Sequence, residues 1–274
     1  MKERGKTEVN YEFRMCLFLD ILGFSDRVRK SANDTNQFTR IVKAINILRQ
    51  HFSEDGAHIS KRVTQFSDSV VVSYAIDERS GVFNLLYDVG LCLIRLMDHG
   101  FLMRGGIAVG NLLHTETHLF GPAMNDAYLL ESKAANYPRV IVQEDLLLAA
   151  RHAPASQHDA EHELKYVQSL LRRDFDGLLY IDYIRWDSVV STFGGDNASY
   201  PAYLSAIAKL ISENIFSGNP AIASKYGWVA RHYMETKSQI ERLDEHHPFN
   251  IENPGYVEKI RKLPSFPAPG EVEY

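Results

Sequence analysis

The stretch RMCLFLD, residues 14–20, constrains the fold most, because it is an almost continuous apolar run that ends in an aspartate. Such a run is typical of a central strand covered on both faces, whereas a half-exposed strand would alternate apolar and polar residues. Asp20 would then lie at the carboxyl end of a buried strand, just before Gly23 and Phe24 in FLDILGF. A charge at this position calls for an explanation from the rest of the chain.

The segments after this strand predict a defined order of elements. Apolar residues recur at three- and four-residue steps from Phe38 to Leu48, which predicts a helix. In HISKRVTQFSDSVVVSY, two β-rich runs are joined by the polar turn Ser67-Asp68-Ser69, which predicts a hairpin. A second helix is expected over 81–100, and the glycine-containing run FLMRGGIAVG predicts another strand with a bend or a close backbone approach.

This β-α-β-β-α-β order is the split, ferredoxin-like arrangement of the α+β class, in which the first strand and the hairpin meet at one edge of an antiparallel sheet. Asp20 and Asp68 would therefore lie close together. Two neighbouring carboxylates repel each other unless a cation shares them, and a pair of Mg²⁺ or Mn²⁺ ions held by aspartates suits phosphoryl transfer. Either aspartate alone is more simply explained as a turn former; their joint placement favours a metal site.

Composition limits the partners and the compartment. The 274 residues carry a formal net charge of −5, which argues against a broad nucleic-acid surface. Cys16 and Cys92 lie in apolar runs, so we expect buried thiols in a cytoplasmic protein rather than disulfides or a zinc site. No run reaches the roughly 18 apolar residues of a membrane span, and the polar N-terminus does not resemble a signal peptide, so neither a membrane nor export is expected.

Four motifs in order now carry a family resemblance: FLDILGF, TQFSDSVVV, MRGGIAVG and LFGPAMNDAYLLESKAANYP. Over about residues 14–185 the chain resembles the catalytic domain of class III nucleotidyl cyclases. Within that family it is most similar to the stand-alone bacterial pyrimidine cyclases of the Pycsar anti-phage system. The resemblance implies a catalytic domain over 11–190, followed by a C-terminal helical extension and tail over 191–274.

The resemblance also implies the roles of residues around the aspartate pair. Asp20 and Asp68, with the backbone carbonyl of Ile21, would bind two Mn²⁺ or Mg²⁺ ions. Gly23 and Phe24 would open a helix whose N-terminus faces the triphosphate, although Gly23 is equally well explained as a turn glycine. Arg104 matches an arginine that contacts the triphosphate; the alternative is an ion pair with a carboxylate.

The rest of the site would come from a second subunit, because such cyclases are head-to-tail homodimers with sites at the interface. Asn125 matches the asparagine that orients the ribose, and the alternative is a helix cap. One helical turn later, Leu129 stands where purine cyclases generally have an arginine that stabilises the transition state. Lys133, Arg172 or Arg173 could supply the missing charge, and Arg173 is preferred.

The positions that read the base depart from the purine pattern. A lysine and an aspartate of the purine cyclases are replaced by Thr64 and His118, which disfavours adenine and is compatible with uracil or cytosine. We therefore expect UTP, ahead of CTP, to be converted to a cyclic nucleotide that activates a separate effector. A bacterial purine cyclase and a non-catalytic nucleotide-binding module are the alternatives.

Two further motifs and the extension carry less chemistry. GGIAVG lacks the features of a P-loop or a dinucleotide fingerprint. HDAEH, 158–162, has two histidines four residues apart but no apolar face, so a solvated segment is expected. Two helices are expected over 201–215 and 223–243, with packing or dimer-bracing roles, and an extended or disordered tail over 262–274.

Overall fold

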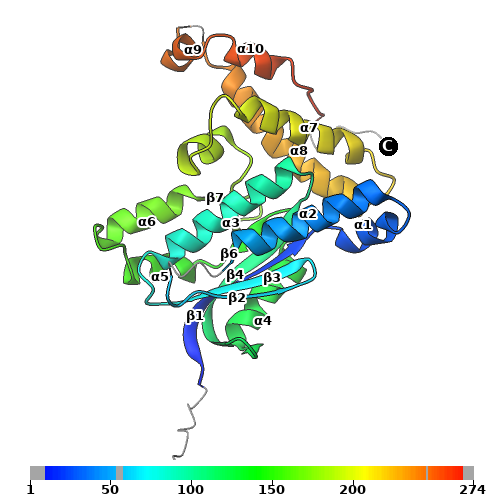
Figure 1. Ribbon diagram of the computed structural model, residues 1–274. Coiled ribbons are helices and arrows are strands. Elements are labelled where there is room, and N and C mark those ends of the chain that lie inside the picture. The colour runs from blue at the N-terminus through cyan, green and yellow to red at the C-terminus, as the bar shows by residue number, and fades with distance from the viewer. Residues whose placement is uncertain (1–9, 54–57, 245, 268–274) are drawn as a thin grey trace, which may run out of the picture.

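The computed structural model describes residues 10–53, 58–244 and 246–267. In Figure 1 a mixed sheet lies behind α2 and α3, and the C-terminal helices stack at one end of it. In chain order the elements are β1 (Glu12–Ile21), α1 (Phe24–Ser31), α2 (Thr35–His51), β2 (Arg62–Phe66), β3 (Ser69–Ala75), α3 (Gly81–Asp98), β4 (Met103–His114), β5 (Leu119–Phe120), α4 (Pro122–Leu129), the π-helix η1 (Leu130–Ala134), β6 (Val140–Val142), α5 (Asp145–His152), α6 (Ala160–Ser169), β7 (Leu171–Arg173), β8 (Leu179–Ile181), the π-helix η2 (Asp187–Thr192), α7 (Tyr200–Asn214), α8 (Pro220–Glu241), α9 (Pro248–Glu252) and α10 (Tyr256–Arg261).

The strands are ordered β2-β3-β1-β4-β6-β8-β7, and β5 pairs with β4. Strand β1 is central and antiparallel to both β3 and β4, which confirms the strand expected at 14–20. The α+β class and the β-α-β-β-α-β order are likewise confirmed, with the ferredoxin-like order β2-β3-β1-β4 continued by three further strands. The first connection holds two helices, because the side chain of Asp34 caps a new helix by accepting from the amides of Asn36 and Gln37.

The apolar stripe predicted for α2 is partly wrong. Ile41, Leu48 and, between them, Ala44 and Ile47 are buried, but Phe38 and Val42 are exposed. The buried face of α2 is therefore centred on Ile41, Ala44 and Leu48, and it leaves out Phe38 and Val42 of the predicted stripe.

The side chains of β1 alternate between two apolar layers, as the period of a strand requires. Met15, Leu17 and Leu19 face the large core under α2 and α3, whereas Cys16 and Phe18 face a smaller cluster with α4 on the opposite side of the sheet. Both faces of β1 are thus covered, which explains its continuous apolar sequence. Asp20 continues the second row, so it lies on the α4 face of the sheet.

The glycines of β4 allow α4 and η1 to approach the sheet. A Cβ atom on Gly106 would lie 2.4 Å from the Cβ of Leu130 and 2.5 Å from the carbonyl oxygen of Ala127. A Cβ on Gly105 would lie 2.6 Å from the carbonyl oxygen of Phe18. These distances are below ordinary contact, so the expected close backbone approach is present at both positions.

The C-terminal extension packs on the sheet domain and shares its core. Leu204 and Ile207 of α7 and Trp228 and Val229 of α8 belong to the same apolar cluster as the residues of β1 and α3. The two expected helices are confirmed as α7 and α8, and α9 and α10 add two short helices that the sequence reading missed. The expected tail lies partly outside the described residues; in its described part, Phe266 packs edge-on against Tyr233 of α8.

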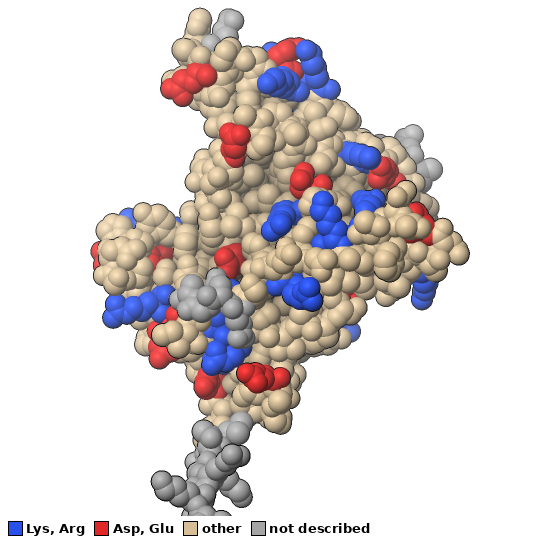
Figure 2. All heavy atoms as spheres, viewed as in Figure 1, with Lys and Arg blue, Asp and Glu red and all other residues tan. Residues whose placement is uncertain are grey.

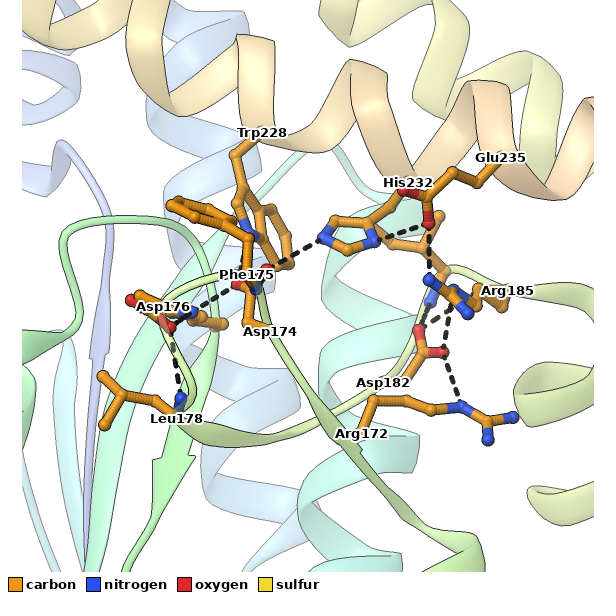
Figure 3. Close-up of polar contacts among 12 residues, drawn as sticks. Arg172, Asp174, Phe175, Asp176, Leu178, Asp182, Arg185, Trp228, His232 and Glu235 are labelled. Carbon is orange, nitrogen blue, oxygen red and sulfur yellow. Dashed lines mark hydrogen bonds and ion pairs between the residues drawn. The ribbon is translucent and has the colours of Figure 1, made fainter.

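A buried polar network joins α8 to the β7–β8 hairpin (Figure 3). The indole Nε1 of Trp228 donates to Asp174 Oδ2 at 2.7 Å. The ring of His232 lies between two carboxylates, 3.9 Å from Asp174 and 3.5 Å from Glu235. Arg139, which is 0% exposed, pairs with Asp174 and with Asp176, both in the turn of the hairpin. The extension is therefore fixed to the sheet by charges as well as by apolar contacts.

We expect Arg139→Ala to lower the free energy of unfolding by about 3–5 kcal/mol, because it leaves Asp174 buried without its cation. The measurement is urea denaturation followed by circular dichroism. Arg173→Ala is the matched control, since Arg173 makes an exposed ion pair with Glu144 and should cost no more than about 1 kcal/mol. Equal losses in the two variants would contradict this role of the network.

Three general expectations can be compared with the structure. Cys16 and Cys92 are both buried free thiols, as expected. On the face viewed in Figure 2, positive and negative side chains are interspersed. Among the described residues, no helix combines the length and apolar character needed to cross a membrane.

Candidate functional site

The candidate site lies on the α4 face of the sheet, because strand register places its residues there together. Asp20 at the end of β1 is paired with Ser69 of β3 on one side and with Arg104 of β4 on the other. Directly paired residues project on the same face of a sheet. Thr64 of β2 is paired with Val71, whose side chain packs in the α4-side cluster, so Thr64 shares this face.

The carboxylate of Asp20 lies close enough to Asp68 for the two negative charges to repel each other. Ser69 Oγ donates a hydrogen bond to Asp20 Oδ1 at 2.8 Å. Asp68 lies in the turn between β2 and β3, where Ser67 has a φ of 57°. Burial, together with the nearby carboxylates of Asp68 and Glu131, raises the pKa of Asp20 to about 6, although the hydrogen bond from Ser69 opposes the rise. The two aspartates thus interact, as the sequence predicted from the topology.

Arg104 does not stand free beside Asp20. Its guanidinium pairs with Glu131 of η1, a carboxylate that is only 3% exposed. Burial raises the pKa of Glu131, and Arg104 opposes that shift. The sequence reading allowed Arg104 a carboxylate partner but missed Glu131; a charged residue inside the AYLLESKAA segment was the available signal. Glu131 lies in a π-helical turn, a feature that often marks functional sites.

The donor set fits hard divalent cations. Asp20, Asp68 and the carbonyl of Ile21 would supply oxygen ligands, which Mg²⁺ and Mn²⁺ prefer. Burial and the neighbouring carboxylates raise the pKa of Asp20, and a shared cation would oppose that rise. Among the described residues, no group of three or more His, Cys, Asp and Glu side chains is arranged for a metal ion, so two carboxylates, the main chain and a substrate would have to share the coordination.

Helix α1 begins directly beyond this pair. Gly23 precedes its first residue, Phe24, with a φ of 72°, a conformation that favours glycine. No atom lies within 4 Å of a Cβ built on Gly23, so the approach to the helix N-terminus is open. Phe24 is partly buried and packs against the large core. Helix α1 therefore begins at the predicted residue, and no side chain caps its first amides.

A cation from the extension also lies near Arg104. Burial lowers the pKa of Lys225 of α8, and the charge of Arg104 lowers it further. The sequence reading assigned no chemistry to the extension and missed Lys225. No local motif surrounds this lysine in IASKYGW, so only the packing of α8 reveals it.

The residues expected to act across a subunit interface do not join the aspartates within one chain. Asn125 of α4 is exposed, and in the described part of the chain no hydrogen bond or ion pair links it to Asp20 or Asp68. Leu129, one turn later, is also exposed, as is Lys133 in η1. These three side chains are therefore open to a partner.

The two arginines of β7 lie at the opposite edge of the sheet from Asp68. Arg172 pairs with Asp187 and lies 3.7 Å from Asp182, so it belongs to a structural network (Figure 3). Arg173 is half exposed and pairs with Glu144 at 2.9 Å. Of the two, Arg173 is the more accessible cation.

Thr64 and His118 do not contact each other in this structure. Thr64 Oγ1 lies 2.9 Å from Nε2 of His114. His118 is exposed in the turn between β4 and β5, where its ring contacts the hydroxyl of Thr117. The sequence reading missed His114, which ends β4 and is the register partner of Leu119, the residue after His118. Thr64 and His114 therefore lie together at one end of the α4 face, whereas His118 stays in the exposed turn.

The histidines of HDAEH have other partners. His158 Nδ1 lies 2.8 Å from the buried carboxylate of Glu163. Asp159 caps α6, because its Oδ1 accepts from the amides of Glu161 and His162. Its Oδ2 lies 3.0 Å from His162 Nδ1. The segment therefore forms the start of α6, in agreement with the solvated segment expected from the sequence.

Comparison with known proteins gives only distant structural similarities. No protein-family model and no curated protein sequence matches the chain. A bacterial light-regulated adenylyl cyclase is similar over 58% of this chain and 57% of its own, with 13% identity and a TM-score of 0.37. The adenylyl cyclase CyaB from P. aeruginosa is similar over 62% of this chain and 92% of its own, with 13% identity and a TM-score of 0.42. At these values the similarity places the chain in no family.

Proposed function

We propose that the protein is a metal-dependent nucleotidyl cyclase of the class III type. The observation that carries the proposal is the pair of aspartates at the end of β1 and the tip of the β2–β3 hairpin, with the pKa of Asp20 raised by burial and by its neighbours. Such a carboxylate pair is stabilised by divalent cations. The sequence motifs around it, read on this sheet order, support the same activity.

In the proposed reaction the 3′-hydroxyl oxygen of a nucleoside triphosphate attacks its own α-phosphorus. The bond from that phosphorus to the bridging oxygen of the β-phosphate breaks, pyrophosphate leaves, and the proton of the hydroxyl passes to solvent. Bound Mg²⁺ or Mn²⁺ would lower the pKa of the hydroxyl and neutralise the phosphates. Asp20 and Asp68 hold that charge in place, and Gly23 lets the phosphates approach the amides at the start of α1.

Arg104, the register partner of Asp20, adds positive charge beside the aspartates. Arg104 is paired with Glu131. This ion pair would hold the guanidinium of Arg104 in place before the triphosphate binds. Charges fixed before the reaction stabilise developing charge without reorganisation. Lys225 would contribute from the extension, which gives α8 a role at the site besides packing.

The complete site needs a second copy of the chain. Asn125 is exposed, and the chain around it carries the exposed apolar side chains Phe120, Tyr128 and Leu129. Exposed apolar clusters of this kind mark interaction surfaces, and a twofold dimer would bring the same surface of each chain together. Asn125 and Arg173 of one chain would then complete the site formed by Asp20 and Asp68 of the other.

The proposed substrate is a pyrimidine triphosphate, UTP ahead of CTP, because Thr64 and His118 replace the charged residues that read a purine. The cyclic product would act as a messenger on a separate effector, as in Pycsar-like anti-phage defence. This part rests on the sequence resemblance and on the uncharged character of the half-buried Thr64 position.

The deciding experiment incubates the full-length protein with each of UTP, CTP, ATP and GTP in Mn²⁺ and identifies products by mass spectrometry. We expect cyclic UMP and pyrophosphate. Cyclic AMP or cyclic GMP as the main product would replace the pyrimidine proposal with a purine cyclase. Nucleotide binding without any cyclic product would favour a non-catalytic module, which Leu129 in place of the usual arginine supports.

A further inference from the structure

A cavity of about 320 Å³ lies where α7 of the extension meets α2 and the turn after α3. Its charged lining residues are Arg40 and Lys43 of α2, Asp98 at the end of α3, and Lys209 and Glu213 of α7. In Figure 2 basic side chains lie over α2 and towards α7 on this face of the molecule. The cavity is thus formed between the sheet domain and the extension, and it shares no lining residue with the aspartate pair.

The cations of this cavity are incompletely neutralised. Among the described residues, neither Arg40 nor Lys43 forms an ion pair with a carboxylate. Lys209 Nζ lies 4.0 Å from Glu213 Oε1, and both side chains are largely exposed, so this pair is weak. With Asp98 included, three cations and two carboxylates line the cavity, which leaves an excess of positive charge.

The ring of His99, which also lines the cavity, is subject to the same excess. Burial lowers the pKa of His99. The charge of Lys43 lowers this pKa further, and Arg95 and Arg40 act in the same direction. Asp98 opposes the shift, but by less than Lys43 favours it. A further positive charge is therefore disfavoured at this position, and an anion is favoured.

Arg40 is held in place by the turn beside it. Its Nη2 donates to the carbonyl oxygen of His99 at 3.3 Å, and its guanidinium lies 6.0 Å from the centre of the Phe101 ring. Gly100 has a φ of 79°, and a Cβ atom built on it would lie 2.5 Å from the same nitrogen. The guanidinium therefore lies against the main chain of the turn. Its other N–H groups have no hydrogen-bond partner among the described residues, so they are free to donate to a ligand.

We propose that this cavity binds a phosphate group, which Arg40 and Lys43 contact from α2 and Lys209 contacts from α7. A phosphate group carries up to two negative charges at pH 7 and offers several oxygen acceptors, so cations from different elements can bind it together. Phe101 and Leu210 belong to the apolar lining, which suits the organic part of a phosphate monoester. A bound phosphate would bridge the sheet domain and the extension. The inference does not depend on the proposed cyclase reaction.

The first test measures the binding of inorganic phosphate to the full-length protein by isothermal titration calorimetry, without divalent metal and at constant ionic strength. We expect a Kd of about 1 mM. Lys43→Gln and Arg40→Gln should each weaken binding about tenfold, because each removes one charge-assisted contact. Asp98→Asn should tighten binding about threefold, because it removes a repelling carboxylate. Lys165→Gln is the matched control: it removes an exposed lysine of α6 outside the cavity and should leave binding unchanged.

Three outcomes of this titration overturn the inference. One is the absence of binding at about 10 mM phosphate. Another is binding that is unchanged in Lys43→Gln and Arg40→Gln when circular dichroism shows both folded. The third is binding that is lost in Arg104→Gln but kept in Lys43→Gln, which would place the anion beside the aspartates. If Arg40→Gln does not fold, Lys43→Gln decides alone, since the side chain of Lys43 has no hydrogen bond or ion pair to lose among the described residues.

Thermal unfolding gives a second, independent measurement. At about 10 mM, phosphate should raise Tm by about 2 °C relative to chloride at the same ionic strength, because a ligand of the folded chain stabilises it. In Lys43→Gln the rise should fall below about 1 °C. An equal rise in the wild type and in Lys43→Gln overturns the site.

Phenyl phosphate distinguishes two sources of the phosphate group. Binding at least about threefold tighter than that of inorganic phosphate assigns the cavity to a phosphate monoester, because the ring buries apolar surface. Equal or weaker binding assigns it to free phosphate. Phenol should not compete with phosphate, and competition by phenol at equal concentration overturns the role of the cations. None of these measurements uses turnover, so this inference and the proposed cyclase function can fail independently.

Discussion

Replacing Asp20 or Asp68 by alanine is expected to reduce kcat by at least about 1,000-fold, because each change removes a carboxylate that would hold the metal ions. The measurement is the rate of cyclic nucleotide formation at saturating Mn²⁺ and UTP. Near-normal activity in either variant would refute the assignment of the aspartate pair. The effect should not depend on which triphosphate is used, since both residues act on the phosphates.

Asp20→Asn separates this loss of activity from misfolding. Burial and neighbouring carboxylates raise the pKa of Asp20 to about 6, so the charged form is disfavoured in the folded protein without metal. Removing that charge should raise the free energy of unfolding by about 1–2 kcal/mol at pH 7.5. The sign follows because a carboxyl group with a raised pKa in the folded state is penalised above that pKa and relieved as pH falls towards the unfolded value.

The second large effect is expected from mixing two inactive proteins, Asp68→Ala and Asn125→Ala. If each site takes its aspartates from one chain and its asparagine from the other, a mixed dimer has one intact site and one site with both changes. At equal concentrations about half of the dimers are mixed, so about a quarter of the wild-type activity should return. The measurement is cyclic nucleotide formation after subunit exchange.

A mixture of Asp68→Ala and Asp20→Ala is the matched control, because both changes fall on the same half of the site. This mixture should stay inactive. Exchange is verified by pulling down a tagged chain with its untagged partner. If exchange occurs and the Asp68→Ala and Asn125→Ala mixture remains inactive, sites shared between two chains are refuted.

Local sequence pattern was sufficient to locate the aspartate pair. The unbroken apolar run before Asp20 requires a strand covered on both faces, and the polar turn at Asp68 requires a hairpin. Once the order of elements is known, the ferredoxin-like topology brings the two together, and the structure shows them interacting. Burial periodicity is a property of consecutive residues, so it can be read before the chain folds.

The partners of the other site residues could not be read in this way. Arg104 pairs with Glu131 only because the glycines of β4 let η1 approach the sheet. Thr64 meets His114 rather than His118 because the end of β4 reaches the face shared by β2 and β3. Neither pair has a spacing rule that a sequence motif could display.

The sequence by itself determined the buried strand β1, the hairpin turn at Asp68 and the helices of the extension, because each depends on the polarity of neighbours along the chain. Only the tertiary structure decided that the charge of Arg104 acts on Lys225, that Arg172 is held by Asp182 and Asp187, and that Thr64 forms a hydrogen bond with His114. These contacts join segments far apart in the chain. They depend on the register and twist of the sheet and on how the helices pack against it, which no local pattern specifies.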